Sequence, residues 1–233
     1  MPDDGSVHPI KYKNFMDFNV ALKQFRDELR ETIQDDRLNL FHYTFLAQHY
    51  GMPTPALDWS TDPLIALYFA VDGFEYTNED EFPVVYILNP TRLNENSAMY
   101  YTDGNRTISE IYCVDNADDK IFENCFSDMN NTPFSIMPFA VKSDYDLKSQ
   151  RITRQSGVFT LHEARYFKGV ELINFVDKNG EKMGVALKIS PSSVELIKNQ
   201  LKILNLTPET IYGQELTILE EKAKSISKET PKI

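Results

Sequence analysis

Apolar side chains recur every three or four positions near the start of the chain. Within NFMDFNVALKQFRDELRETIQ this spacing joins Phe15, Phe18, Leu22, Phe25, Leu29 and Ile33. Such a repeat places these side chains on one face of an amphipathic helix. The sequence therefore predicts a helix over residues 13–36 whose apolar face packs into the core.

The next apolar run predicts a second helix over residues 38–50. Gly51 suits the C-terminal end of this helix, and Pro53 and Pro55 prevent its continuation. The segment TPALDWST that follows has the pattern of an extended strand.

A third helix is predicted directly after this strand. Thr61 or Asp62 could cap it, with Pro63 at its first position. Its sequence, LIALYFAVDGF, is apolar nearly all round, which is typical of a buried helix.

The middle of the chain has the pattern of β-structure. Short apolar runs predict strands at PVVYILN, FSIMPFAV, SGVFTLH and MGVALKIS, the last one after the turn signal DKNG. Residues 90–132 are polar and are expected to contain a mobile loop.

The end of the chain is again helical in pattern. PSSVELIKNQLKILN and ETIYGQELTILEEKAKSI predict helices, and SKETPKI a frayed tail. We expect one α+β domain over residues 1–233, with a central mixed or antiparallel sheet and helices at both ends of the chain. Its central part covers residues 46–190 and its C-terminal helices cover residues 191–228.

Composition and charge narrow the class of protein. Of the 233 residues, 42% are hydrophobic and 25% are charged, which is ordinary for a soluble globular protein. The net charge of −11 argues against broad binding to nucleic acid or to an anionic membrane. The polar start does not resemble a signal peptide, and the run PLIALYFAV is too short to span a bilayer. We therefore expect a cytoplasmic protein.

The two cysteines, Cys113 and Cys125, have no CxxC motif or Cys/His cluster around them. This argues against a structural zinc site and favours two free thiols in a reducing compartment. No metal site is predicted.

The first group of candidate residues lies in LAQHYGMPTPALDWSTDPLIALYFAV. Gln48 and His49 precede a stiff Gly-x-Pro-x-Pro turn, and Asp58 follows it. Once the chain reverses, Asp58 could fix the tautomer of His49, which could then act as a general base. Alternatively, Asp58 only satisfies backbone groups at the turn and His49 is a satisfied core histidine.

The second group lies in DLKSQRITRQSGVFTLHEARYFKG. Lys148, Arg151 and Arg154 form a basic stretch in an acidic chain, and Gln155 adds amide donors. Arginine binds phosphate and carboxylate groups well, so a phosphate-bearing molecule or a nucleotide is a candidate ligand. Alternatively, the arginines bridge acidic side chains of the same protein.

Several common motifs are missing from the sequence. It contains no GxGxxG, GxxxxGK[ST], HExxH or GxSxG pattern, which argues against a standard dinucleotide fold, a P-loop and the corresponding hydrolases.

The segment LAQHYGMPTPALDWSTDPLIALYFAV resembles the signature of the FRG domain family, roughly AQH-G-PTRLLDWT--P--AL-FA. FSIMPFAVKSDYDLKSQRITRQSGVFTLH is similar to the family's second block, and ELIKNQLKILNLTPETIYGQEL to its C-terminal part. Members are typically bacterial or phage-borne, often in settings that suggest toxin or defence roles. The resemblance implies a fold more firmly than a reaction.

This chain departs from the family pattern in two places. It has no N-terminal (F/Y)RG motif. Phe25 and Arg26 are followed by aspartate instead of glycine, and they lie within the apolar repeat of the first predicted helix. Pro55 and Ala56 stand where the family usually has Arg and Leu.

A further likeness is to ADP-ribosyltransferases. STDPLIALYFA is similar to the Ser/Thr segment that lines their nicotinamide pocket, and Glu163 could be their carboxylate that polarises the ribose. The first element of their pattern is missing. This likeness implies NAD as a substrate.

We therefore expect an FRG-type domain that binds a nucleotide or another phosphate-containing ligand, with NAD as the candidate substrate of an ADP-ribosyltransferase-like enzyme. The expected ligand-binding residues are Gln48, Ser60 and Thr61 on one side and Arg151, Arg154 and Gln155 on the other. The expected catalytic residues are His49, Asp58 and Glu163.

Two alternatives stay open. One is a non-enzymatic protein-interaction domain, in which the acidic surface and the polar middle segment engage a partner protein. The other is a metal-dependent nuclease with Asp58, Asp62 and Glu163 as ligands, which EDTA would inhibit.

Overall fold

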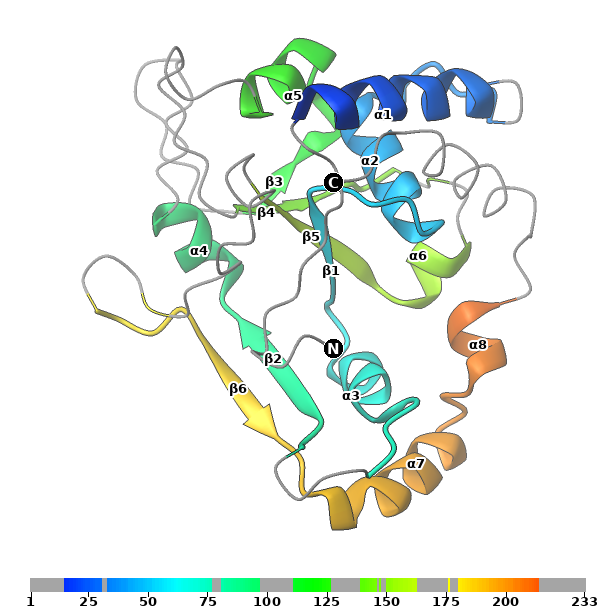
Figure 1. The fold of residues 1–233 in the computed structure, drawn as a ribbon, viewed down its shortest axis with the longest axis vertical. Helices are drawn as coiled ribbons and strands as arrows, with labels where there is room; N and C mark the ends of the chain where they lie inside the picture. Colours follow the sequence, from blue (N-terminus) through cyan, green and yellow to red (C-terminus); the bar gives the residue numbers. More distant parts are fainter. Residues whose placement is uncertain are drawn as a thin grey trace.

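The computed structural model describes residues 15–30, 33–76, 81–96, 111–126, 139–145, 147, 150–162, 176 and 180–213. They form helices around a four-stranded sheet, with a separate two-stranded sheet (Figure 1). The predicted α+β class is confirmed. The helices are α1 (Phe15–Arg30), α2 (Leu40–His49), α3 (Pro63–Val71), α4 (Pro90–Asn96), α5 (Asp119–Phe126), α6 (Gln150–Arg154), α7 (Val194–Ile203) and α8 (Pro208–Tyr212), with short 3-10 turns η1 (Val114–Asn116) and η3 (Pro191–Ser193).

The four-stranded sheet has the order β1-β5-β4-β3. The β1–β5 and β5–β4 pairs are antiparallel and the β4–β3 pair is parallel, so the sheet is mixed. Strands β2 and β6 form the second sheet as an antiparallel pair. The strands are β1 (Ala56–Ser60), β2 (Val84–Leu88), β3 (Tyr112–Cys113), β4 (Phe139–Lys142), β5 (Gly157–Leu161) and β6 (Gly184–Lys188).

Helix α2 is the centre of the main core. All of its residues except Gln48 are buried, and the ring of Phe45 stacks on Phe159 of β5 with 4.1 Å between centroids. In Figure 1, α1 lies at the top, above α2, and α2 runs down from it toward the sheet. Because Gln48 stands in the last turn of α2, the packing of this helix against β1 brings Gln48 to Asp58 in the middle of the strand.

Helix α3 begins as predicted but is less buried than predicted. Asp62 accepts a hydrogen bond from the N–H of Leu64, with Pro63 at the first helical position. Only the stripe of Ile65, Tyr68 and Val71 is buried. Leu64 and Phe69 are each 40% exposed, so the prediction of a helix buried all round is wrong. A short helix that packs through one stripe leaves its other apolar side chains in solvent.

The polar segment over residues 90–132 contains regular structure where it is described. Helices α4 and α5 and strand β3 lie in it, and residues 97–110 and 127–132, where the expected loop would have to lie, are outside the described residues. The side chain of Asn94 in α4 donates to the backbone oxygen of Ala140 at 3.0 Å and accepts from its N–H at 2.6 Å. It thereby supplies hydrogen-bond partners to a residue of β4 that lies beyond the end of the short strand β3.

The predicted helix from Glu209 ends early in the described part of the chain. Helix α8 stops at Tyr212, and Gly213 has a φ of +69°, which helical residues do not adopt. The rest of that prediction lies outside the described residues. None of the described helices combines the length and the apolar character needed to cross a membrane.

Candidate functional site

The end of α2 meets β1 through a chain of side-chain hydrogen bonds. The amide of Gln48 donates to Asp58 Oδ2 at 2.8 Å and accepts from Thr54 Oγ1 at 2.6 Å. Thr54 Oγ1 in turn accepts from the N–H of Ala56 at 3.1 Å. The stiff turn between α2 and β1 therefore fixes the Asp58 carboxylate relative to the helix.

The Asp58 side chain reaches solvent, yet protein atoms crowd its surroundings. This loss of bulk solvation raises the pKa of its carboxyl, while the bond from Gln48 and the charge of Arg151 act in the opposite direction. Asp58 therefore takes up a proton more readily than a fully solvated aspartate.

His49 is buried, and its Nε2 atom has no hydrogen-bond partner among the described residues. Burial, and then the positive charge of Arg151, lowers its pKa to about 3. The imidazole is neutral at pH 7 and too weak a base to take up a proton readily. The donor to Asp58 is Gln48 and not His49, in contrast to the pairing expected from the sequence.

Arg151 joins the two halves of the expected site. It extends from α6, donates from Nη1 to the backbone oxygen of His49 at 3.3 Å, and its guanidinium lies 5.1 Å from the ring centroid of Tyr212. Its positive charge acts to lower the pKa of both His49 and Asp58. The structure thus brings Arg151 to Gln48, His49 and Asp58, although about a hundred positions separate them in the sequence.

The remaining expected ligand residues hold backbone groups together. Arg154 Nη1 donates to the backbone oxygen of Glu209 at 3.2 Å, and Gln155 Nε2 donates to that of Ile211 at 3.4 Å. Ser60 Oγ donates to the backbone oxygen of Gln155 at 2.7 Å. Thr61 bonds the backbone oxygen of Ser156. These bonds fasten β1, α6 and α8 to one another. Glu163 lies outside the described residues.

Sequence reasoning missed a group of tyrosines next to Arg151. Tyr212 Oη donates to Asp72 Oδ2 at 3.0 Å, and its ring lies near those of Tyr68 and Phe69. Burial, with the adjacent Asp72, raises the pKa values of Tyr68 and Tyr212 to about 12, so both hydroxyls stay protonated at neutral pH. No local motif marks this group, because Asp72 and Tyr212 are 140 positions apart.

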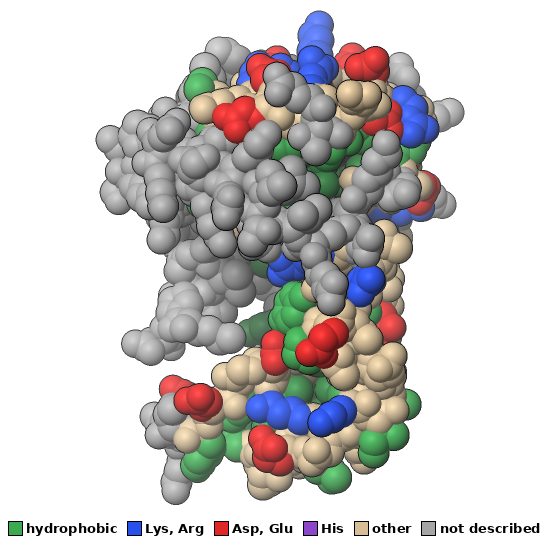
Figure 2. Space-filling view, turned by 90° about the vertical axis from the view of Figure 1, so that its right-hand side faces the viewer, with side chains coloured by type: hydrophobic (Ala, Val, Ile, Leu, Met, Phe, Trp, Pro, Cys, Tyr) green, Lys and Arg blue, Asp and Glu red, His purple; other side chains and the backbone are tan. Residues whose placement is uncertain are grey.

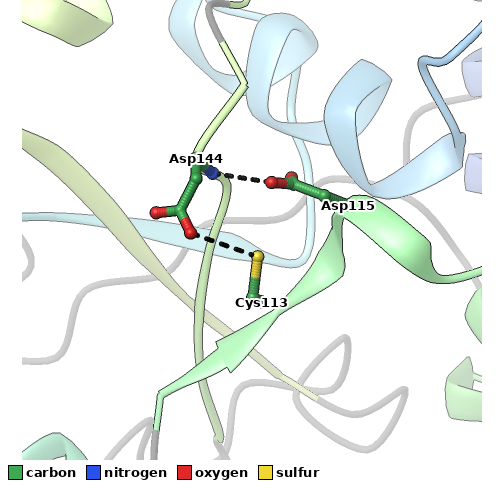
Figure 3. A group of neighbouring side chains, drawn as sticks. All are labelled: Cys113, Asp115 and Asp144. Atoms are coloured by element: carbon green, nitrogen blue, oxygen red, sulfur yellow. Dashed lines mark hydrogen bonds between the residues drawn. The ribbon is translucent and has the colours of Figure 1, made fainter.

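A second polar cluster lies at the start of α2, next to His42. The ligand-type atoms of Cys113, Asp115 and Asp144 come within 4.8 Å of one another (Figure 3). Asp115 accepts from His42 Nε2 at 3.0 Å, from Ser143 Oγ at 2.6 Å and from the N–H of Asp144 at 2.9 Å. Burial opposes ionisation of Asp115, but these hydrogen bonds outweigh it and lower its pKa. Both carboxylate oxygens of Asp115 are thus already bonded, which disfavours a metal ion.

The cysteine of this cluster, Cys113, is a free thiol, in line with the sequence. Its Sγ lies 3.6 Å from Asp144 Oδ2, and burial raises its pKa. A raised pKa leaves little reactive thiolate at neutral pH. The side chain of Cys125 is outside the described part.

The aspartates expected for a nuclease have other partners. Asp62 caps α3 and Asp58 bonds Gln48. Within the described residues, the group with metal-ligand proximity is that of Cys113, Asp115 and Asp144.

The model of the FRG domain family matches residues 7–79. Residues 7–79 thus belong to the FRG domain family. The matched part includes α1, α2, β1 and α3, and with them Gln48, His49 and Asp58. Arg151 and Tyr212 reach the site from beyond the matched residues. Comparisons with curated proteins and with solved structures gave no match.

Proposed function

We propose that this FRG domain protein binds a phosphate-bearing ligand between Arg151 and His49. The observation that carries the proposal is the buried Nε2 of His49, which has no partner among the described residues and lies in the field of Arg151. Buried polar atoms nearly always have a hydrogen-bond partner, and a bound ligand can supply one. A phosphate oxygen would accept from the guanidinium and from the Nε2–H tautomer of His49 together.

A nucleotide fits the remaining groups better than inorganic phosphate does. The Asp58 carboxylate, held by Gln48 at 2.8 Å, faces the same arginine and can accept a hydrogen bond from a ribose hydroxyl. A nucleotide offers the phosphate and the hydroxyl in one molecule. NAD is the first candidate because of the likeness to ADP-ribosyltransferases.

A more specific proposal is that the protein catalyses an ADP-ribosyltransferase-like reaction in a toxin or defence system. It rests on that likeness, with Glu163 as the carboxylate that would polarise the ribose. Incubation with NAD should release nicotinamide, and Glu163→Gln should abolish this release while NAD binding persists. Equal release of nicotinamide by the variant would show that Glu163 takes no part in the reaction.

Thermal unfolding with and without ligand tests the binding proposal. NAD, ADP-ribose, ATP, GTP and inorganic phosphate would each be added to the intact chain at saturating concentration. At one hundred times Kd, a ligand stabilises the folded state by about 2.7 kcal/mol, which raises the Tm of a chain of this size by roughly 5–10 °C.

Matched variants locate the binding. Arg151→Ala should lose the rise in Tm with every ligand, and Asp58→Ala should lose it with the ligands that carry a ribose, whereas Arg92→Ala should keep it. Arg92 is a suitable control because it lies on α4 and pairs with Glu181 at the surface. A rise that persists in Arg151→Ala would refute the site.

A protein-interaction role is the second candidate. On the β2–β6 sheet, Ile87 and Val185 lie opposite each other and are 49% and 41% exposed, and Leu187 beside them is 50% exposed. An exposed apolar face of this kind is typical of an interaction surface. A folded chain whose Tm responds to none of the five ligands would favour this role over ligand binding.

A further inference from the structure

Aromatic side chains of α3 and α8 adjoin Arg151. The Tyr212 ring, which the guanidinium overlies at 5.1 Å, lies 5.9 Å from Phe69 and 6.3 Å from Tyr68, at interplanar angles of 70° and 66°. The side of the molecule that carries α6, α7 and α8 shows hydrophobic side chains at the surface, between basic and acidic ones (Figure 2).

Two features of this aromatic group favour a ligand. Phe69 is 40% exposed although its ring contacts those of Tyr68 and Tyr212. Tyr68 Oη is buried and makes no hydrogen bond of good geometry among the described residues, although the Asp72 carboxylate lies close to it. A purely structural cluster would more commonly bury the first and satisfy the second.

Asp72 gives the group a polar edge. It follows Phe69 by three positions at the end of α3, is exposed, and accepts the Tyr212 hydroxyl through Oδ2. Its carboxylate would repel an acidic group and accept hydrogen bonds from N–H donors.

We propose that Phe69, Tyr212 and Asp72 bind the base of a nucleotide whose phosphate Arg151 holds, an inference that rests on the proposed function. The base stacks on the exposed ring of Phe69, and its amino or imino N–H groups donate to Asp72. A nucleobase is the one part of a nucleotide that combines a flat π-face with N–H donors on its edge. A sugar phosphate lacks both, so the ligand class is narrowed to nucleotides.

Calorimetric titration of the intact chain tests this assignment with ribose 5-phosphate, AMP and GMP. Stacking of one base on an aromatic side chain contributes enough to change affinity by roughly tenfold or more. AMP and GMP should therefore bind at least about tenfold more tightly than ribose 5-phosphate.

Phe69→Leu should remove most of this difference and leave the affinity for ribose 5-phosphate unchanged. Leu64→Ala is the matched control, since Leu64 lies on the same helix with the same 40% exposure, and it should keep the difference. Asp72→Asn, which retains the shape of the side chain, should weaken both nucleotides several-fold and spare ribose 5-phosphate.

The outcomes separate the two proposals. Equal binding of ribose 5-phosphate and both nucleotides would overturn the base site and leave the phosphate site standing. Nucleotide binding that Phe69→Leu and Asp72→Asn leave intact would also overturn the base site. Binding of none of the three would overturn the proposed function and the base site with it.

Discussion

Helix α2 carries two buried histidines whose surroundings differ. His42 Nδ1 accepts from the N–H of Asn39 at 3.0 Å, Nε2 lies 3.0 Å from Asp115, and the ring stacks on Tyr145. His49, two turns later, has an Nε2 without a partner among the described residues and the cation of Arg151 beside it. One histidine is saturated by the protein, and the other is left with hydrogen-bonding capacity.

This difference separates a residue that stabilises the fold from a candidate ligand contact. Burial lowers the pKa of both imidazoles, so a shifted pKa does not distinguish them. The number of hydrogen bonds that each ring makes does distinguish them. The network of His42 joins the start of α2 to η1 and to the end of β4, and it offers little to a ligand.

The largest expected effect is at Asp115, the hydrogen-bond partner of His42. Asp115→Ala removes the acceptor of three donors, from His42, Ser143 and Asp144. We expect the free energy of unfolding to fall by about 2–3 kcal/mol, since an unsatisfied group at His42 or Ser143 costs roughly 1 kcal/mol or more, whereas the exposed N–H of Asp144 can bond water. Urea unfolding measures this. Asp27→Ala, which removes an exposed carboxylate on α1, should cost less than about 0.5 kcal/mol. A similar loss in both variants would remove the contrast between the two histidines.

The second effect is a dependence of stability on pH. His49 has a pKa of about 3 when folded and 6.5 when unfolded, so the unfolded chain binds more protons between these values. Stability from this residue is complete above pH 6.5 and falls on acidification, by at most about 1.4 kcal/mol per pH unit.

His49→Gln tests this dependence because glutamine does not titrate. The loss of unfolding free energy between pH 7 and pH 5 should shrink by up to about 2 kcal/mol relative to the parent chain. His42 contributes equally to both chains and cancels. Identical losses would show that His49 is not buried as a neutral imidazole.

A third effect of about 1 kcal/mol is expected at Gln48. Gln48→Leu loses the bonds to Thr54 and Asp58 at the edge of the site. It should also raise the pKa of Asp58 further, because the bond from Gln48 lowers that pKa. Carbon-13 NMR titration of the aspartates follows the pKa. Gln24→Leu, at an exposed position of α1, is the control. An unchanged Asp58 pKa would mean that Gln48 does not hold the carboxylate in solution.

The smallest effect is expected at Cys113. Its thiol makes one long contact to Asp144, so Cys113→Ala should change stability by less than about 0.5 kcal/mol. Added Zn²⁺ should not raise the Tm of the parent chain, because the oxygens of Asp115 are already bonded. A rise with Zn²⁺ that EDTA reverses and Cys113→Ala abolishes would identify the cluster as a metal centre.

Local patterns predicted the parts of this structure that depend on neighbours in sequence. The start of α3 follows from Asp62 and Pro63, and the end of α2 from Gly51, which has a φ of +82°. Arg151 stood out because a short basic stretch interrupts an acidic chain. Helices α4 and α5 were missed because they are only 7 and 8 residues long and lie within a polar segment. The apolar residues of α5 do recur at helical spacing, but over too few turns to stand out from the sequence around them.

The contacts that distinguish the two histidines could not be predicted in the same way. His42 and Asp115 are 73 positions apart, and Asp72 and Tyr212 are 140 apart. Nothing in the immediate neighbours of His42 and His49 indicates which ring gains a hydrogen-bond partner, because that depends on the contacts of α2 with η1 and α6. A pairing of His49 with Asp58 was expected from their separation of nine positions, yet the intervening turn places Gln48 at the carboxylate instead.

The pairing of β1 with β5 has a consequence for protein synthesis. Ala56 lies opposite Leu161, so β1 has no partner strand until more than a hundred further residues have been translated. At a translation rate of ~5–20 residues per second, the apolar α2 and α3 segments wait roughly 5–20 seconds on the ribosome without their sheet. During that interval the nascent chain exposes two strongly apolar segments, and a chaperone that shields residues 40–71 would be expected to raise the yield of folded protein.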